Sequence, residues 1–278
     1  MKPGDFEFVS QLVRERAGIV LSADKAYLVE SRLAPIARKE GMASIDDVVA
    51  AIRLRRDSRM IETVVDAMTT NETFFFRDKT PFEILETHVL PELVARKRGG
   101  TLRIWCAAAS TGQEPYSIAM VADAMGPRLA GTRIEILATD LSERCLEKAK
   151  AGTYTQFEVQ RGLPVQMLLK HFTKAGDSWN ISPTLKGQVR FRAMNLLDDF
   201  RALGRFDAIF CRNVLIYFDL PTKKRILDRM AQQVEDPGFL FLGAAETVLG
   251  VTDAFKPVSG FRGLYARDAT RVGARFAA

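Results

Sequence analysis

Residues 102–115, LRIWCAAASTGQEP, decide the fold of this 278-residue chain. The apolar run that ends at Trp105 favours a buried strand, and Pro115 can open a helix because the first turn of a helix tolerates proline. Small residues lie between them, so the backbone can approach a ligand closely. Strand, small-residue turn and helix in this order predict an open α/β sheet, which binds ligands at the carboxyl ends of its strands.

Strand and helix signals continue to alternate after this stretch. Residues 134–139, 206–210 and 239–242 are short apolar runs typical of buried strands. Ser142 can cap a helix after the first of them, and a further helix is expected over about 221–234. The alternation predicts a parallel sheet with helices between its strands.

Residues 1 to about 68 indicate short helices and no strand. Ser22 can cap one helix, although Pro35 inside it implies a kink or an early end. Ser44 can cap the next helix, with two aspartates in the first turn, where the helix dipole favours negative charge. This part of the chain is therefore expected to form a small helical domain.

Glycines and prolines across residues 154–188 break the alternation of strands and helices. Trp179 and Ile181 favour strands there, so we expect an insertion of one short helix and a small antiparallel ribbon. A helix start is also expected at Thr80, as a capping hydroxyl before Pro81. The predicted divisions are a helical domain (1–70), a linker and junction helix (71–90), an α/β domain (91–268) with its insert at about 153–190, and a tail (269–278) expected to fray.

Composition places the chain among folded soluble proteins, with 47% hydrophobic and 27% charged residues. It begins without the charged-then-apolar pattern of a secretory signal, and no apolar run approaches the roughly 20 residues that span a bilayer. We therefore expect a cytoplasmic protein without stable membrane insertion. The net charge of +6 permits an acidic partner, although solvated arginines are the commoner reason for such a charge.

Two side-chain types that often carry catalysis are scarce. Cys106, Cys145 and Cys211 are odd in number and widely spaced, which indicates neither a disulfide framework nor a zinc site. His88 and His171 are the only histidines, so a metal-dependent or histidine-based mechanism is disfavoured. We expect no metal cofactor, and the chemistry has to be carried by other groups.

The residues that follow the first two strands point to a nucleoside ligand. The second strand ends at Asp140, where an acidic side chain can accept two ribose hydroxyls, and Ala107 belongs to the small-residue turn after the first strand. The G-x-G-x-x-G fingerprint, the P-loop and the G-x-S-x-G elbow are absent, which disfavours NAD enzymes, ATPases and α/β-hydrolases. Without a phosphate cradle, the expected ligand is a non-phosphorylated nucleoside, a description that S-adenosylmethionine fits.

Five ordered motifs carry a family resemblance. Residues 69–78, TTNETFFFRD, place three phenylalanines in a row, which neither a strand nor a helix buried on one face requires. The motifs that follow are WCAAASTGQEPYSIAM (105–120), ATDLS (138–142), AMNLLD (193–198) and FDAIFCRNVLIYF (206–218). In this order they resemble the chemotaxis receptor glutamate methyltransferases of the CheR family, and the likeness extends over residues 6 to 267.

The resemblance implies both a fold and an activity. The fold is an α/β, class I (Rossmann-like) methyltransferase domain with a small antiparallel β-subdomain insert, preceded by a small all-α domain. The activity is transfer of a methyl group from S-adenosylmethionine to glutamate side chains of chemoreceptor cytoplasmic helices. The products are glutamate methyl esters and S-adenosylhomocysteine. No general base is required, because a glutamate carboxylate is already ionised at neutral pH.

The resemblance also implies the site residues. Arg77, Arg212 and Tyr217 would lie nearest the reacting methyl group. One of the two arginines is expected to pair with the methionyl carboxylate of the cofactor, and Tyr217 to donate a hydrogen bond to the incoming glutamate. Residues 74–76 would both pack the domain junction and wall the cofactor. The implied cofactor residues are Asn71, Thr73, Arg77, Ala107, Glu114, Asp140, Asn195, Leu196, Arg212 and Asn213.

Plainer interpretations exist beside these. Asp140 can merely cap the following helix, Arg77 can stay solvated or pair with Asp78, and Tyr217 can belong to the core. For the whole protein, the alternatives are a class I methyltransferase acting on RNA and a non-catalytic module that binds the cofactor and signals through a partner. Against RNA, no surface module of aromatic and basic residues is evident.

The expected partner is a chemoreceptor with acidic coiled-coil helices rather than a nucleic acid, and nothing demands more than a monomer. A basic patch in the helical domain is expected to orient the receptor. Residues 171–189 form a shorter stretch than in family members that bind a receptor pentapeptide, which favours an enzyme without that tether. The patch consists of Lys25, Arg32, Arg38, Lys39, Arg53, Arg55, Arg56 and Arg59.

Overall fold

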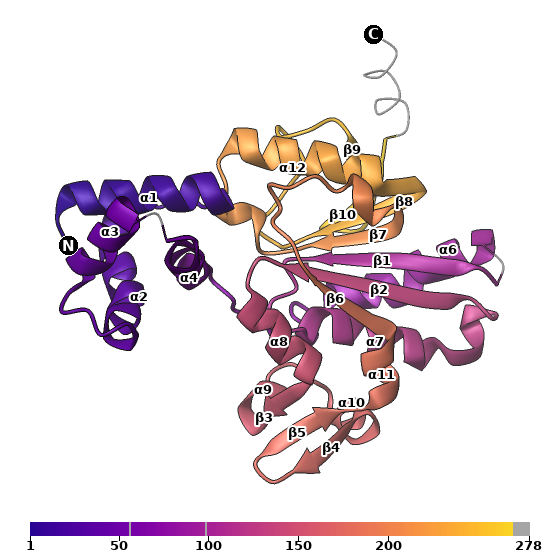
Figure 1. Ribbon diagram of the computed structural model, residues 1–278. Coiled ribbons are helices and arrows are strands. Elements are labelled where there is room, and N and C mark those ends of the chain that lie inside the picture. Colours follow the sequence, from indigo (N-terminus) through magenta and orange to yellow (C-terminus); the bar gives the residue numbers. More distant parts are fainter. Residues whose placement is uncertain (56, 98, 269–278) are drawn as a thin grey trace. The chain divides into compact units, whose positions relative to one another are not determined.

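The computed structural model describes residues 1–55, 57–97 and 99–268 (Figure 1). The chain divides into two compact units. One comprises Met1–Thr70 and Tyr217–Thr222, and the other comprises Asn71–Ile216 and the chain from Lys223 on. Arg56, the side chain of Arg55 and the tail that is expected to fray lie outside the described residues.

The helical unit is held together by apolar side chains spaced four residues apart. Val9 and Val13 on α1, and Val29 and Leu33 on α2, are fully buried. Such spacing puts both members of a pair on one face of a helix, which is why these segments fold as amphipathic helices. The elements are α1 (Pro3–Ala17), the 3₁₀ turn η1 (Ala23–Lys25), α2 (Ala26–Lys39), α3 (Ile45–Arg55) and α4 (Ser58–Met68).

The helix starts expected in this unit are confirmed in part. Ser44 caps α3: its Oγ accepts a hydrogen bond from the Asp47 N–H at 3.2 Å, and the Asp47 carboxylate accepts one from the Ser44 N–H at 2.9 Å. Ser22 instead precedes η1 and makes no side-chain cap bond. The expectation of an early end at Pro35 was wrong, because buried residues on both sides of it keep α2 helical through that position.

The second unit is built on a seven-stranded sheet. β1 (Thr101–Ala107) lies inside it and pairs in parallel with β2 (Arg133–Asp140) and β7 (Phe206–Cys211). The strand order is β6-β2-β1-β7-β8-β10-β9, which reads 3-2-1-4-5-7-6 when these seven strands alone are counted in chain order. The other strands are β6 (Val189–Ala193), β8 (Val234–Leu242), β9 (Phe255–Pro257) and β10 (Leu264–Arg267).

The expected Rossmann-like α/β fold is confirmed, but the sheet is mixed rather than wholly parallel. β10 pairs antiparallel with both β8 and β9. At four and three residues, β10 and β9 are too short to carry a recognisable alternation, and they depend on pairing for their conformation. The run expected at 239–242 is only the buried second half of β8.

Helices flank the sheet and hold its loops (Figure 1). α7 (Gln113–Met125) and α8 (Glu143–Ala151) contact β2, and α6 (Leu90–Lys97) contacts β1. Ser142 caps α8 as predicted, accepting from the Cys145 N–H at 3.2 Å. Thr80 does not cap a helix, because Lys79 holds the cap position and Thr80 is already helical. The remaining elements are α5 (Thr80–Ile84), the π-helical turn η2 (Leu85–Val89), the 3₁₀ turns η3 (Gly126–Leu129), η4 (Arg201–Leu203) and η5 (Leu215–Tyr217), and α12 (Leu220–Gln233).

The insert contains more structure than one helix and a ribbon. It holds three short helices and a three-stranded antiparallel sheet in the order β3-β5-β4. Phe75 is fully buried and meets the rings of Tyr154 at 5.0 Å and Phe172 at 5.6 Å. Of the three phenylalanines expected to pack the domain junction and wall the cofactor, Phe75 thus packs inside the α/β unit, where it fastens the insert. The elements are β3 (Thr153–Thr155), α9 (Gln156–Gln160), α10 (Val165–His171), β4 (Phe172–Ala175), β5 (Ser178–Ile181) and α11 (Pro183–Gln188).

Candidate active site

The loop between β1 and α7 approaches its neighbours as closely as its small residues suggested. Ala108 and Ser110 have φ angles of 61° and 48°, and Gly112 has a φ of 94°. A Cβ on Gly112 would lie 2.8 Å from the Cβ of Ala149 and 3.0 Å from the Tyr154 hydroxyl, so no larger residue fits there. The loop therefore packs tightly against Ala149 and Tyr154, which fixes its backbone.

Asp140 connects this loop to the start of α8. Its Oδ2 accepts a hydrogen bond from the Ser110 N–H at 2.7 Å, and its Oδ1 accepts one from the Ser142 N–H at 2.9 Å. The carboxylate is 6% exposed and lies at the carboxyl end of β2. It thus does organise the turn before α8, as the plainer interpretation held, but it also bonds the loop of the neighbouring strand.

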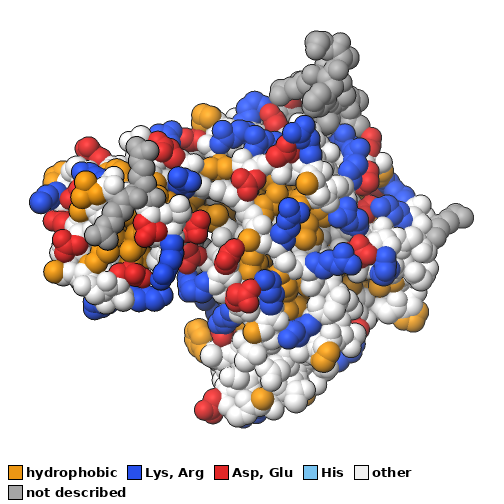
Figure 2. Space-filling view, viewed as in Figure 1, with side chains coloured by type: hydrophobic (Ala, Val, Ile, Leu, Met, Phe, Trp, Pro, Cys, Tyr) orange, Lys and Arg blue, Asp and Glu red, His pale blue; other side chains and the backbone are white. Residues whose placement is uncertain are grey.

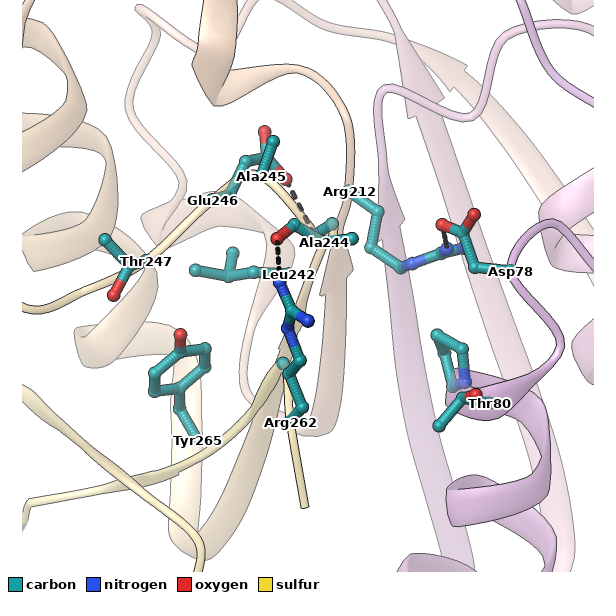
Figure 3. A pocket seen from close by; sticks show the side chains of 13 residues that line it. Asp78, Thr80, Arg212, Leu242, Ala244, Ala245, Glu246, Thr247, Arg262 and Tyr265 are labelled. Atoms are coloured by element: carbon teal, nitrogen blue, oxygen red, sulfur yellow. Dashed lines mark hydrogen bonds and ion pairs between the residues drawn. The ribbon is translucent and has the colours of Figure 1, made fainter.

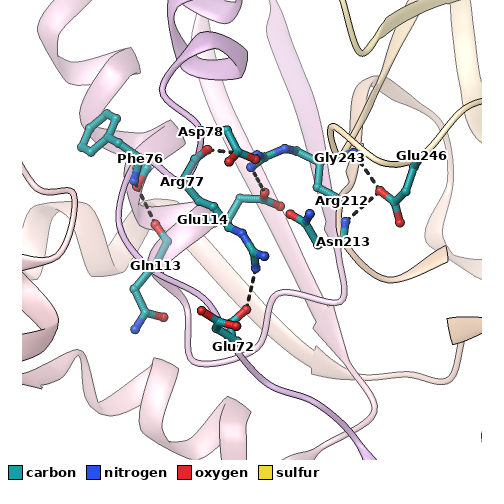
Figure 4. A network of polar contacts seen from close by, with 11 residues as sticks. Glu72, Phe76, Arg77, Asp78, Gln113, Glu114, Arg212, Asn213, Gly243 and Glu246 are labelled. Carbon is teal, nitrogen blue, oxygen red and sulfur yellow. Dashed lines mark hydrogen bonds and ion pairs between the residues drawn. The ribbon is translucent and has the colours of Figure 1, made fainter. Parts of the chain in front are cut away.

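Arg212, which directly follows β7, is the centre of a buried polar network (Figure 4). Its Nη1 donates to Glu114 Oε2 at 2.8 Å, and its Nη2 donates to Asp78 Oδ2 at 2.7 Å and to the Arg77 carbonyl at 2.9 Å. The guanidinium also lies over the Phe82 ring, 5.7 Å from its centroid. Only 1% of the Arg212 side chain and 12% of the Glu114 side chain are exposed, so this ion pair is shielded from water, whereas the Asp78 side chain is 42% exposed.

Burial and the neighbouring Arg212 cation shift the pKa of the Glu114 carboxyl in opposite directions. Burial raises the pKa of its carboxyl above the ordinary value, and the charge and hydrogen bond of Arg212 oppose that rise. Cys106 and Cys211 flank the same network, and burial raises the pKa of each thiol. Both cysteines therefore stay protonated and act as small core residues rather than as nucleophiles.

Arg77 has fewer hydrogen-bond partners than Arg212. It lies half-buried, its Nη1 donates to the Glu72 carbonyl at 2.7 Å, and its guanidinium faces the Phe74 ring at 5.6 Å. Asp78 pairs with Arg212, which argues against the interpretation that Arg77 pairs with Asp78.

Glu246 is a buried residue of this network that sequence reasoning missed. Its two carboxylate oxygens accept hydrogen bonds from the backbone N–H groups of Asn213, Val214, Leu215 and Gly243. Figure 4 shows the bonds from Asn213 and Gly243. The available signal was an acidic residue four positions after the last predicted strand.

Backbone strain is concentrated around these residues. Seven non-glycine residues of the described chain have positive φ, and six of them belong to the segments above. Such conformations cost on the order of 1–3 kcal/mol each and tend to cluster at functional sites. The six are Phe76, Asp78, Lys79, Ala108, Ser110 and Asn213.

The structure brings most predicted site residues to the carboxyl ends of adjacent strands. Asn71 accepts a hydrogen bond at its carbonyl from the Ser110 hydroxyl at 2.8 Å, and Thr73 is half-buried. Asn195 follows β6 and accepts from the Leu197 N–H at 3.0 Å, next to Leu196, which is 8% exposed.

Tyr217 is the exception among the predicted residues. It belongs to the helical unit, where its carbonyl accepts a hydrogen bond from the Val20 N–H at 2.9 Å. Its side chain is half-buried. Its catalytic role stays a prediction.

A pocket of about 600 Å³ lies beside the Arg212 network and was not foreseen. Figure 3 shows Asp78 and Thr80 on one side and Thr247 and Tyr265 on the other, with Arg262 between them. Part of its wall comes from β10, one of the two strands that the sequence did not reveal. The carboxyl ends of β7 and β8 therefore border an open cavity as well as the buried network.

The described ranges contain neither a metal-ion cluster nor a membrane-spanning helix. No group of three or more His, Cys, Asp or Glu side chains is arranged there to hold a metal ion. Within those same residues, no helix has the length and apolar character that crossing a bilayer needs.

Comparison with known proteins identifies relatives for both units. The family described as "CheR methyltransferase, SAM binding domain" matches residues 71–263, and "CheR methyltransferase, all-alpha domain" matches residues 4–69. The chain is 44% identical to chemotaxis protein methyltransferase 1 of Pseudomonas aeruginosa, over 95% of this chain and 97% of the relative. It is 42% identical to chemotaxis protein methyltransferase Cher2 of Pseudomonas putida, over 91% of this chain and 94% of the relative.

Proposed function

The chain belongs to the CheR methyltransferase family and is an S-adenosylmethionine-dependent methyltransferase, and we propose that its methyl acceptors are glutamate side chains of chemoreceptors. The products would be glutamate methyl esters and S-adenosylhomocysteine. The observation that carries this proposal is the family match across residues 4–69 and 71–263, because the second range contains all of the candidate cofactor residues.

The groups at the strand ends fit S-adenosylmethionine. The small residues of 107–112 carry little side-chain bulk to keep a ligand from the backbone, and Asp140 is a buried carboxylate where α/β folds hold ribose hydroxyls. A carboxylate has about four acceptor sites, so its bonds to Ser110 and Ser142 are compatible with hydroxyl donors as well. We assign the other cofactor contacts to Asn71, Thr73, Arg77, Glu114, Asn195, Leu196, Arg212 and Asn213.

Arg77 is a better candidate than Arg212 for the methionyl carboxylate. Arg212 already donates to two carboxylates and one carbonyl, and its side chain is only 1% exposed, so a cofactor carboxylate has little access to it. Arg77 donates to one backbone carbonyl and otherwise faces a ring. We therefore propose that Arg77 holds the cofactor and that Arg212 fixes Glu114 and Asp78 around it.

When bound, S-adenosylmethionine supplies a sulfonium methyl group, which a carboxylate oxygen can accept without a general base. A glutamate with a reference pKa of about 4.3 is ionised at neutral pH. No histidine is then needed as a general base. The contribution of this chain is then alignment and desolvation of the acceptor. We propose that Tyr217 donates a hydrogen bond to the acceptor carboxylate, while Arg77 stays on the cofactor, since an arginine on the acceptor would stabilise its ground state.

The surface proposed to meet an acidic receptor helix is smaller than the basic patch expected from the sequence. Arg32 donates to a backbone carbonyl of its own unit at 2.6 Å, and Arg53 and Arg59 each pair with a carboxylate. Figure 2 shows basic and acidic side chains interspersed on the visible face of the helical unit. The patch members proposed to bind the receptor are Lys25, Arg38 and Lys39.

We propose that the enzyme does not need a pentapeptide tether. The antiparallel pair β4 and β5 is joined by only two residues, 176 and 177. A loop this short offers few residues to contact a peptide. Titration with a receptor-type pentapeptide is expected to give no binding at micromolar concentration. Micromolar binding would overturn this part of the proposal.

Transfer of labelled methyl groups tests the acceptor. Wild-type protein is expected to label a chemoreceptor cytoplasmic fragment, with release of the label in alkali because the product is an ester. Asp140→Ala is the control and should lose both the labelling and the calorimetric binding of S-adenosylhomocysteine. Label on RNA instead of receptor would support the RNA alternative, and cofactor binding without any transfer would support the non-catalytic module.

A further inference from the structure

Glu246 binds backbone groups from two loops at once. Its Oε2 accepts from the N–H of Asn213 at 2.8 Å and of Gly243 at 2.7 Å. Its Oε1 accepts from the N–H of Val214 at 2.9 Å and of Leu215 at 2.7 Å. The residue is 9% exposed. Three of these charge-assisted hydrogen bonds join the loop that follows β7 to the loop that follows β8, which contains Glu246, and the fourth, from Gly243, lies within the second loop.

The backbone conformation of Asn213 and the missing side chain of Gly243 allow these hydrogen bonds to form. Asn213 has a φ of 59°, a left-handed conformation that asparagine tolerates better than most residues. A Cβ on Gly243 would lie 2.7 Å from Asn213 Nδ2, 2.8 Å from Glu246 Oε2 and 2.9 Å from the Asn213 nitrogen. The backbone of the second loop thus packs directly against the first, and only glycine leaves room for the carboxylate between them.

The residue beside this junction is Arg212. It is bonded on its other side to Glu114 and Asp78, as Figure 4 shows. The Glu246 bonds begin one residue later, at the backbone N–H of Asn213, so they restrain the backbone next to Arg212. Any relaxation of the loop after β7 would move Arg212 and Asn213 together.

We propose that Glu246 is a positioning residue of the cofactor site, which holds Arg212 and Asn213 where S-adenosylmethionine or S-adenosylhomocysteine meets them. The inference rests on the proposed assignment of these two residues to the cofactor. Glu246 itself touches neither the cofactor nor the acceptor in this account. It acts through the backbone of its neighbours, and its loss should weaken binding of the adenosyl ligand rather than only the fold.

Glu246→Gln and Asp207→Asn form a matched pair for the test. Asp207 is also a buried carboxylate of this unit that accepts a backbone N–H, from Arg103 at 2.8 Å, and it pairs with Lys97. It lies at the start of β7, whereas Arg212 follows the end of that strand. Both substitutions turn a carboxylate into a neutral amide by replacing one oxygen with an NH2 group. Both are expected to lower the melting temperature.

Calorimetric titration with S-adenosylhomocysteine separates the two roles. Glu246→Gln is expected to raise the Kd tenfold or more, and Asp207→Asn to leave it within twofold of wild type. Gly243→Ala, which adds a Cβ against Asn213 and Glu246, should reproduce the weaker binding, and it supplies the test if Glu246→Gln does not fold. A folded Glu246→Gln or Gly243→Ala variant that binds within twofold of wild type would overturn this inference and leave the proposed function standing. Failure of the wild type to bind would instead overturn the proposed function, and this inference with it.

Discussion

Arg212 Nη1 donates to Glu114 Oε2 at 2.8 Å, although the two residues lie 98 positions apart in the chain. The contact joins the end of β7 to the first turn of α7, so it links two strand-end loops of the candidate active site. A buried cation such as Arg212 is tolerated because carboxylates pair with it; here the Glu114 side chain is 12% exposed and the Asp78 side chain 42%. The geometry of the site therefore depends on keeping this set complete.

Arg212→Met should reduce the free energy of unfolding by about 3–5 kcal/mol, because it leaves the Glu114 carboxylate buried and unpaired. Urea denaturation measures the loss. The double variant Arg212→Met/Glu114→Gln should recover part of it. Arg128→Met is the control, since Arg128 forms an exposed pair with Glu86 and such pairs contribute about 0–1 kcal/mol. Equal losses for the two single variants would contradict the argument.

Asp219 should make stability depend on pH in the acid range. Hydrogen bonding to Thr222, followed by its contact with Arg14, lowers the pKa of Asp219 from 3.8 to about 2. The unfolded chain then binds the proton more readily, so the stabilisation is complete above about pH 4 and lost as the pH falls towards 2. Thermal melts should show Asp219→Asn below wild type at pH 6, with the gap closing between pH 4 and pH 2. Asp177→Asn, at an exposed turn, should show no such gap, and a gap that persists at pH 2 would refute the assignment.

Phe75→Ala should destabilise the α/β unit by about 3–5 kcal/mol, since it empties a fully buried site between Tyr154 and Phe172. Phe74→Ala is the matched control, because Phe74 is half-buried and stacks with the Arg161 guanidinium at 4.4 Å. Phe74→Ala should reduce the free energy of unfolding much less than Phe75→Ala does. Denaturant unfolding of both variants measures the contrast, which would be absent if the phenylalanines were interchangeable.

Reversing charge at the end of α2 should weaken the receptor interaction alone. Arg38→Glu combined with Lys39→Glu is expected to raise the KM for the receptor fragment several-fold and to leave the Kd for S-adenosylhomocysteine unchanged. Both side chains are exposed, so the fold should tolerate the change. Arg225→Glu, at an exposed position of α12, is the control for a charge change elsewhere. Equal loss of cofactor binding in the double variant would show that the proposed surface is wrong.

The sequence correctly predicted those helices and strands whose formation depends on a few neighbouring residues. The strand-turn-helix unit around Ala107, the strand that ends at Asp140 and the cap at Ser142 all lie where the sequence indicated, because burial of an apolar run and capping by a hydroxyl are decided within a few residues. β9 and β10 were missed because strands this short take their conformation from the partner that they pair with.

The α/β fold, the helical unit and the family motifs could be predicted from the sequence, since they depend on local periodicity and on ordered residues. Which charges meet depends instead on tertiary contacts. Nothing near Arg212 in the chain reveals Glu114 and Asp78 as its partners, and nothing near Glu246 reveals the four amides that it holds. Such contacts join residues up to 134 positions apart. They form only when parallel strands bring their carboxyl ends to one edge, where burial makes every unpaired polar group costly and so selects the partners.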